Sequence, residues 1–277
     1  MVHVLAAVPT SIHLGAVSLW AAVSRVFGSE ELYVALCVAI YCLVDPGLGA
    51  LAISGVLLGV SNNVLLKVWL RLPRPPRYMW KVPAHGPGFP SGHSEVCASF
   101  WSSIASARRS WALAVAGGAI SALVAASRVA LGVHYVRDVV GGLLIGAALG
   151  AAPALLAAAI GVERSVGVCC AASVAMSIAA IPAASPYPWL GAVARTGLGI
   201  ALGFSLFAFL GHRVREAFRR WGWGARVANF VACIVVSGLL VAASKHVPYP
   251  AAPSFVAGLS IVLIPLGIEA LRRRFSR

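Results

Sequence analysis

The chain has 277 residues, of which 60% are hydrophobic and only 11% are charged. So few charged side chains cannot cover the surface of a water-soluble protein, which excludes a soluble globular domain and indicates a polytopic membrane protein. The net charge of +14 could suggest nucleic acid, but the Lys and Arg residues are spread over many loops instead of one solvated surface. Membrane lipids are therefore the expected surroundings, and no nucleic-acid partner is expected.

Apolar runs of about the length needed to cross a bilayer, roughly 20 residues, recur along the whole chain. In chain order they predict ten transmembrane helices, near residues 4–24, 32–44, 48–70, 92–107, 111–131, 137–160, 167–184, 189–211, 227–244 and 254–271. The second run is short, so nine spans remain an alternative. The predicted fold class is all-α, a polytopic transmembrane helix bundle. Six cysteines lie within apolar stretches without Cys-x-x-Cys spacing and are interpreted as buried thiols.

The distribution of basic residues predicts the orientation of these spans, because cytoplasmic loops carry an excess of Lys and Arg. With both termini inside, the inner loops receive Arg108, Arg109, Arg164, Arg213, Arg215, Arg219, Arg220, Arg226, Arg272, Arg273, Arg274 and Arg277. Apart from the motif loops described next, the outer side receives only Arg25, Arg195 and Lys245. This arrangement predicts an integral protein of the cell membrane whose motif loops face the extracytoplasmic side.

Three separated clusters carry the polar residues best suited to chemistry. The first runs from Lys67 to Arg74-Pro75, the second is Pro90-Ser91-Gly92-His93, and the third extends from Ser127-Arg128 through His134 to Asp138. In the predicted layout all three lie at the same membrane face. They are therefore able to form one site.

These spacings resemble the signature of the type 2 phosphatidic acid phosphatase superfamily, K-x6-R-P, P-S-G-H and S-R-x5-H-x3-D, at every position. The resemblance implies a six-span phosphatase core over residues 1–160, leaving residues 161–277 as about four additional C-terminal transmembrane helices without an assigned role. It also implies that His134 attacks phosphorus to form a phosphohistidine. His93 then protonates the leaving oxygen and later activates water.

The chemistry of the clusters fits that expectation. Cleavage of a phosphate ester needs cations around the nonbridging oxygens, a nucleophile and an acid. Lys67, Arg74 and Arg128 supply positive charge, and guanidinium groups bind phosphate oxygens bidentately. The turn at Ser91 and Gly92 lets the backbone approach an anion at a helix start. Asp138 lies four residues after His134, so a shared helix face is expected to let its carboxylate accept a hydrogen bond from the imidazole. No metal site is expected, and no other cofactor.

Other polar residues near the clusters have two interpretations. Glu95 either tunes His93 or selects a headgroup, or forms a salt bridge to Arg71, Arg77 or Lys81. These three basic residues are candidates for a second phosphate. His85 is either a phosphate contact or a solvated loop residue.

The sequence thus predicts a metal-independent membrane enzyme that hydrolyses a lipid phosphate or diphosphate. An isoprenoid (polyprenyl) diphosphate is the first substrate considered, followed by phosphatidic acid or phosphatidylglycerophosphate. A lipid phosphotransferase differs only in the acceptor of the second step. A lipid transporter or flippase that retained the phosphate pocket is the alternative from another class, and the oligomeric state is left open.

Overall fold

The computed structural model describes residues 10–244, 246–247 and 249–275. Positions 4–9 of the first predicted helix and both chain ends lie outside the described residues. Within the described ranges every regular element is a helix, which confirms the all-α prediction.

Most helices begin and end within a few residues of the predicted positions. The N-terminal elements are α1 (Thr10–Phe27), α2 (Glu30–Ala39), the π-helical turn η1 (Ile40–Val44), α3 (Pro46–Leu70), the 3-10 turn η2 (Arg77–Met79), α4 (Gly92–Arg108), α5 (Trp111–Ala130) and α6 (Val136–Ile160). The C-terminal elements are α7 (Val162–Ala183), α8 (Pro188–Phe204), α9 (Phe207–Arg219), α10 (Trp223–Ser244) and α11 (Ala251–Phe275).

Seven segments of the described chain are long and apolar enough to cross a membrane, or eight if a bent pair counts as one span. The sequence predicts ten. Two features account for the difference: Val17–Val44 forms one candidate span across α1, α2 and η1, and α4 has only 17 residues. The chain is nevertheless a multi-pass membrane protein, since most of its helices are built to lie in a bilayer.

The predicted helix at 189–211 is wrong as a continuous element. The chain bends by 61° between α8 and α9. At the bend, the Ser205 hydroxyl donates to the Leu202 carbonyl at 2.6 Å, so a side chain competes for a helical backbone acceptor. Beyond it, α9 is amphipathic, with Val214 buried and Arg213 exposed. An apolar run alone does not mark such a bend, because the residues on both sides of it are apolar.

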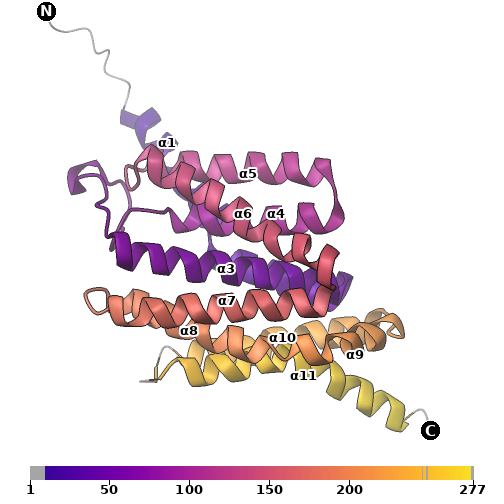
Figure 1. Cartoon of the computed structure of the whole chain (residues 1–277). Coiled ribbons are helices and arrows are strands. Elements are labelled where there is room, and N and C mark those ends of the chain that lie inside the picture. Colours follow the sequence, from indigo (N-terminus) through magenta and orange to yellow (C-terminus); the bar gives the residue numbers. More distant parts are fainter. Residues whose placement is uncertain (1–9, 245, 248, 276–277) are drawn as a thin grey trace, which may run out of the picture.

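Helix α3 lies at the centre of the bundle. It packs against α4 and α6 on one side and against α7 and α8 on the other (Figure 1). Its residues from Pro46 to Gly59 are all buried, as expected for a helix that is apolar all round. The buried core joins Tyr41 and Phe100 to Phe204 and Phe207 without interruption. The two predicted parts of the chain therefore share one core.

The helices alternate in direction, and this alternation gathers the three clusters. The C-terminal ends of α3 and α5 lie at the same end of the bundle as the N-terminal ends of α4, α6 and α8, on the left in Figure 1. The long loop at 71–91 lies at this end as well. The six cysteines take no part in the site, because all are free and buried in the helices.

Candidate active site

Close packing of α4 against α6 brings the second and third clusters together. A Cβ added to Gly142 would lie 2.7 Å from the Ser91 carbonyl oxygen, and one added to Gly146 would lie 2.3 Å from the Glu95 carbonyl oxygen. Only glycine permits so close an approach at these two positions. The Ser91 N–H donates to the Asp138 carbonyl at 2.9 Å, which fixes the start of α4 against the first turn of α6.

The predicted pairing of His134 with Asp138 is present. His134 Nδ1 lies 3.4 Å from Asp138 Oδ2, and both side chains are buried. The pair does not share a helix face, however, because α6 begins at Val136 and leaves His134 in the preceding loop. Asp138 Oδ2 also accepts the Tyr135 N–H at 3.0 Å. One carboxylate oxygen therefore caps the helix and orients the imidazole.

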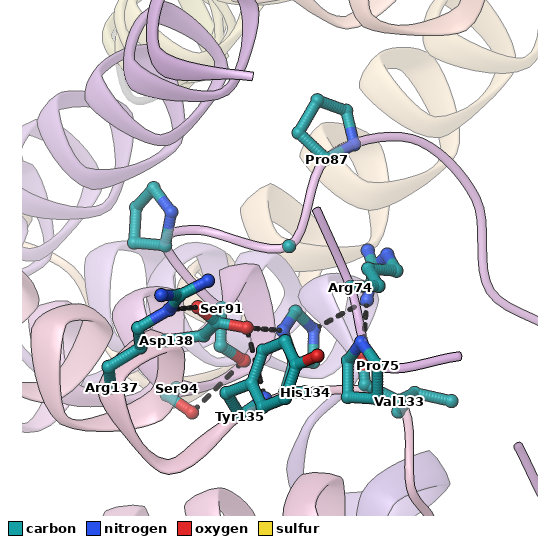
Figure 2. Close-up of polar contacts among 12 residues, drawn as sticks. Arg74, Pro75, Pro87, Ser91, Ser94, Val133, His134, Tyr135, Arg137 and Asp138 are labelled. Carbon is teal, nitrogen blue, oxygen red and sulfur yellow. Dashed lines mark hydrogen bonds and ion pairs between the residues drawn. The ribbon is translucent and has the colours of Figure 1, made fainter. Parts of the chain in front are cut away.

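Arg74 contacts the other side of the His134 ring. Figure 2 shows the ring held between Asp138 and Arg74, whose Nη1 lies 2.8 Å from His134 Nε2. Since guanidinium has no acceptor, Nε2 must carry its lone pair and Nδ1 must carry the proton. This is the tautomer in which Nε2 is available as a nucleophile.

The surroundings of His134 keep its ring neutral. Burial is the largest cause that lowers the pKa of His134 below its ordinary value, and the nearby Arg74 guanidinium acts in the same direction. The hydrogen bond to Asp138 opposes them without reversing the shift. The ring is therefore unprotonated at neutral pH.

Lys67 reaches the site from the last turn of α3, but its ammonium is occupied by backbone. Nζ donates to the carbonyls of Pro90 at 2.7 Å, Pro87 at 3.1 Å and Gly88 at 3.4 Å. Arg74 is anchored in the same way, by the carbonyls of Gly86 and His85. Two of the three predicted phosphate cations therefore also hold the loop that closes over the site.

The guanidinium of Arg128 has a donor that is available for a ligand. The residue is 7% exposed, and its Nη1 donates to the Ser24 hydroxyl at 2.6 Å. Its Nε is buried without a hydrogen-bond partner. A buried N–H without an acceptor costs free energy. An anion that accepts its hydrogen bond removes this cost, so the arrangement is suited to a phosphate oxygen.

The second cluster begins α4, with Ser91 as its N-cap and Gly92 as its first residue. The Ser91 hydroxyl is buried and accepts a hydrogen bond from Ser94 at 3.2 Å. His93 lines the same pocket as His134, together with Gly92 and the three cations. The predicted catalytic and phosphate-binding residues are thus gathered at one place.

Glu95 has partners that the sequence does not indicate. Its carboxylate is fully buried and accepts hydrogen bonds from the amides of Asn63 at 2.7 Å and Asn62 at 2.9 Å. Asn63 also donates to the Pro90 carbonyl at 3.2 Å. The expected salt bridge to Arg71, Arg77 or Lys81 is not formed. Glu95 instead links the second cluster to α3.

The three additional basic residues lie away from the pocket. Arg71 Nε donates to the Val68 carbonyl at 2.9 Å, the Arg77 guanidinium lies over the Trp80 ring at 5.9 Å, and Lys81 Nζ donates to the Ala130 carbonyl at 3.0 Å. All three basic side chains are exposed. His85 does line the pocket, although its side chain is largely exposed.

Several pocket residues were not singled out from the sequence. They include Glu30 of α2, Asn63 of α3, and Trp189, Leu190 and Val193 of α8. The adjacent asparagines at 62 and 63 interrupt an apolar run, which is a signal, since polar side chains within a span usually have a partner. The α8 residues carry no such signal. Within the described part of the chain, no group of three or more His, Cys, Asp or Glu side chains is placed to hold a metal ion.

Comparison with known proteins supports the resemblance. Residues 47–160 match the family model of the PAP2 superfamily. This range includes all three clusters. No curated protein and no solved structure matches the chain.

Proposed function

We propose that this protein, whose residues 47–160 match the family model of the PAP2 superfamily, is a membrane phosphatase that hydrolyses a lipid phosphate through a phosphohistidine at His134. The family indicates a phosphatase-type activity, and the spans place it in a bilayer. The observation that supports the mechanism is the orientation of the His134 ring, with Asp138 at Nδ1 and with the lone pair of Nε2 directed at the Arg74 guanidinium.

In the first step, Nε2 of His134 attacks phosphorus in line with the leaving oxygen. The P–N bond forms as the P–O bond to the lipid alcohol breaks, and His93, in the imidazolium form that the negative charge of a bound phosphate favours, donates a proton to that oxygen and becomes neutral. Asp138 stabilises the positive charge that develops on the ring. In the second step, His93 takes a proton from water, the oxygen attacks phosphorus, and the P–N bond breaks to release inorganic phosphate.

Arg74 must exchange partners during this reaction. It contacts Nε2, the atom that attacks, so its Nη1 moves from His134 to a phosphate oxygen when substrate binds. Arg128 supplies the second guanidinium through its unpaired Nε. These cations provide the charge neutralisation for which many phosphoryl-transfer enzymes use a metal ion, so we propose metal-independent catalysis.

The placement of the extra basic residues bears on the substrate. A diphosphate would need cations for a second phosphate, for which Arg71, Arg77 and Lys81 are the candidates, and none of them lines the pocket. The basic side chains that line the pocket, Lys67, Arg74 and Arg128, accompany a single pair of motif histidines, which is enough for one phosphate group. A lipid monophosphate, of the phosphatidic acid or phosphatidylglycerophosphate kind, is therefore proposed ahead of an isoprenoid diphosphate.

The test is phosphate release by the purified protein in detergent, without added metal, from each of these lipids. His134→Ala and His93→Ala are expected to lower turnover by several orders of magnitude, and Arg77→Ala serves as a control at an exposed position of the loop at 71–91. Full turnover by both histidine variants would overturn the assigned roles. Phosphate transferred to another lipid, instead of released, would identify a phosphotransferase. Failure of the wild type on every lipid would favour binding or transport.

We also propose that the site faces the extracytoplasmic side. The end of the bundle opposite the site carries Arg108 and Arg109 at the end of α4, as the positive-inside rule expects for a cytoplasmic face. Tyr78→Cys, at an 88% exposed position, and Arg108→Cys lie at opposite ends. In intact cells a membrane-impermeant thiol reagent should label the first and not the second. The reverse pattern would place the site inside.

A further inference from the structure

One wall of the candidate pocket comes from outside the segment that matches the family. Helix α8 contributes Trp189, Leu190 and Val193 to the pocket lining, and it begins 28 residues after that segment ends. Leu190 is 1% exposed and packs with Val64 of α3. Trp189 lies against the loop of the first cluster, where a Cβ on Gly86 would be 3.0 Å from the indole Cζ2.

The lining of the pocket combines two kinds of side chain. The histidines and the three cations of the clusters line it, as do the polar Glu30 and Asn63. Apolar side chains line it as well, namely Val60, Val64 and Val96 from α3 and α4 and the α8 residues. The cations and histidines are suited to a phosphate group. The apolar side chains, to which α8 contributes three, offer surface to whatever is attached to the phosphate.

Helix α8 is held in place by the rest of the C-terminal region. A Cβ on Gly199 would lie 2.3 Å from the Ala251 carbonyl oxygen, and one on Gly203 would lie 2.1 Å from the Phe255 carbonyl oxygen. Contact this close fixes α8 between α11 and the central helix α3. The position of the wall thus depends on helices beyond the matched segment.

We propose that Trp189 and Val193 of α8 form the subsite for the hydrocarbon chain next to the scissile phosphate, and so determine the substrate class as an alkyl-chain lipid phosphate. This inference rests on the proposed phosphatase function. A sugar phosphate would need hydrogen-bonding groups along this wall, whereas two of the three α8 side chains are aliphatic. Burial of methylene groups against the wall is the physical source of the selectivity.

The experiment measures kcat/KM for two phosphatidic acids with chains of four and eight carbons, and compares the ratio of the two values. Wild type is expected to prefer the longer chains. Trp189→Ala, at a 44% exposed position, should reduce that preference about tenfold. Val193→Trp should reduce turnover of the longer substrate selectively, because the larger ring fills the subsite.

Trp223→Ala, at an exposed tryptophan of α10 outside the pocket, is the matched control and should leave the ratio unchanged. Because the measurement is a ratio, it does not depend on the amount of folded protein, and the two variants are independent tests. If wild type hydrolyses both lipids and neither variant changes the ratio, the α8 subsite is refuted while the phosphatase proposal stands. If wild type is indifferent to chain length, the subsite is refuted too. If it hydrolyses neither lipid but cleaves a soluble sugar phosphate, the lipid assignment itself fails.

Discussion

Replacing Asp138 with asparagine separates the charge of this residue from its hydrogen bonds. Asp138 Oδ2 accepts from both Tyr135 N–H and His134 Nδ1, whereas Oδ1 lies 3.6 Å from Arg137 Nε. An asparagine carbonyl oxygen placed where Oδ2 lies keeps both bonds. The helix cap and the tautomer of His134 are then preserved, and the negative charge alone is lost.

The magnitude follows from the geometry. Oδ2 lies 3.4 Å from Nδ1, and neither side chain is more than 2% exposed, so solvent screens the pair weakly. Opposite unit charges at this separation attract by roughly 4–5 kcal/mol at an effective dielectric constant of about 20. The ring of His134 becomes positive only as Nε2 bonds to phosphorus, so this energy acts on the transition state. With about 1.4 kcal/mol for each factor of ten, kcat should fall about 10³-fold.

The assay is phosphate release from the best lipid substrate, with thermal unfolding in the same detergent as a check on folding. Arg137→Gln is the matched control, because the Arg137 side chain is 56% exposed and its replacement removes the contact to Oδ1 and the cation–π contact with Tyr135 while the Asp138 charge stays in place. An exposed ion pair contributes at most about 1 kcal/mol, so this variant should keep at least a fifth of the wild-type rate. If a folded Asp138→Asn protein retains more than a tenth of kcat, the carboxylate charge does not stabilise the transition state.

Three further outcomes are expected. Glu95→Leu removes the carboxylate that accepts from the amides of Asn62 and Asn63, at about 1–3 kcal/mol for each lost hydrogen bond, so its unfolding temperature should fall well below that of Glu95→Gln; equal values for the two variants would contradict the role of this network. Burial lowers the pKa of folded His134 below its unfolded value near 6.5, so protonation favours the unfolded chain. The resulting stability is present above about pH 6.5 and is lost as the pH falls, by up to about 1.4 kcal/mol per pH unit. His134→Asn should remove that part of the slope in unfolding measurements at pH 7 and pH 5, and an unchanged slope would speak against a buried neutral ring. Incubation with EDTA should leave phosphate release within twofold of its initial rate, since three cationic side chains supply the charge, whereas a loss restored by magnesium would indicate a metal requirement.

The sequence was sufficient to predict which motifs meet, because their positions at helix ends and the alternation of spans determine their side of the membrane. The pairing of His134 with Asp138 was predicted from a four-residue spacing and is present, but for a different reason. The contact is made across the start of α6, where the carboxylate also caps the helix. The four-residue spacing keeps His134 and Asp138 close along the chain, but the residue at which α6 begins decides how the two side chains meet.

The partners of buried charges were less predictable. The sequence predicts that Glu95 pairs with a basic residue of the preceding loop, acts on His93 or selects a headgroup, yet its carboxylate is bound by two amides from the C-terminal half of α3. Attraction between opposite charges is only one way to satisfy a buried carboxylate, and neutral amide donors achieve it without burying a second charge. Lys67 illustrates the same difficulty, since three backbone carbonyls surround its ammonium. A sequence does not reveal which carbonyls a loop presents.

The contribution of α8 could not be foreseen, because small residues indicate close packing without naming the partner. Gly142 and Gly146 pack on α4, whereas Gly199 and Gly203 pack on α11, and the spacing is the same four residues in each pair. The first pair brings the two histidines to one pocket, and the second fixes the wall beside them. Because the bundle shares one core, a change at either contact alters the shape of the same pocket. The C-terminal helices are therefore part of the structure that shapes the site, although the sequence features that indicate its chemistry end before α7 begins.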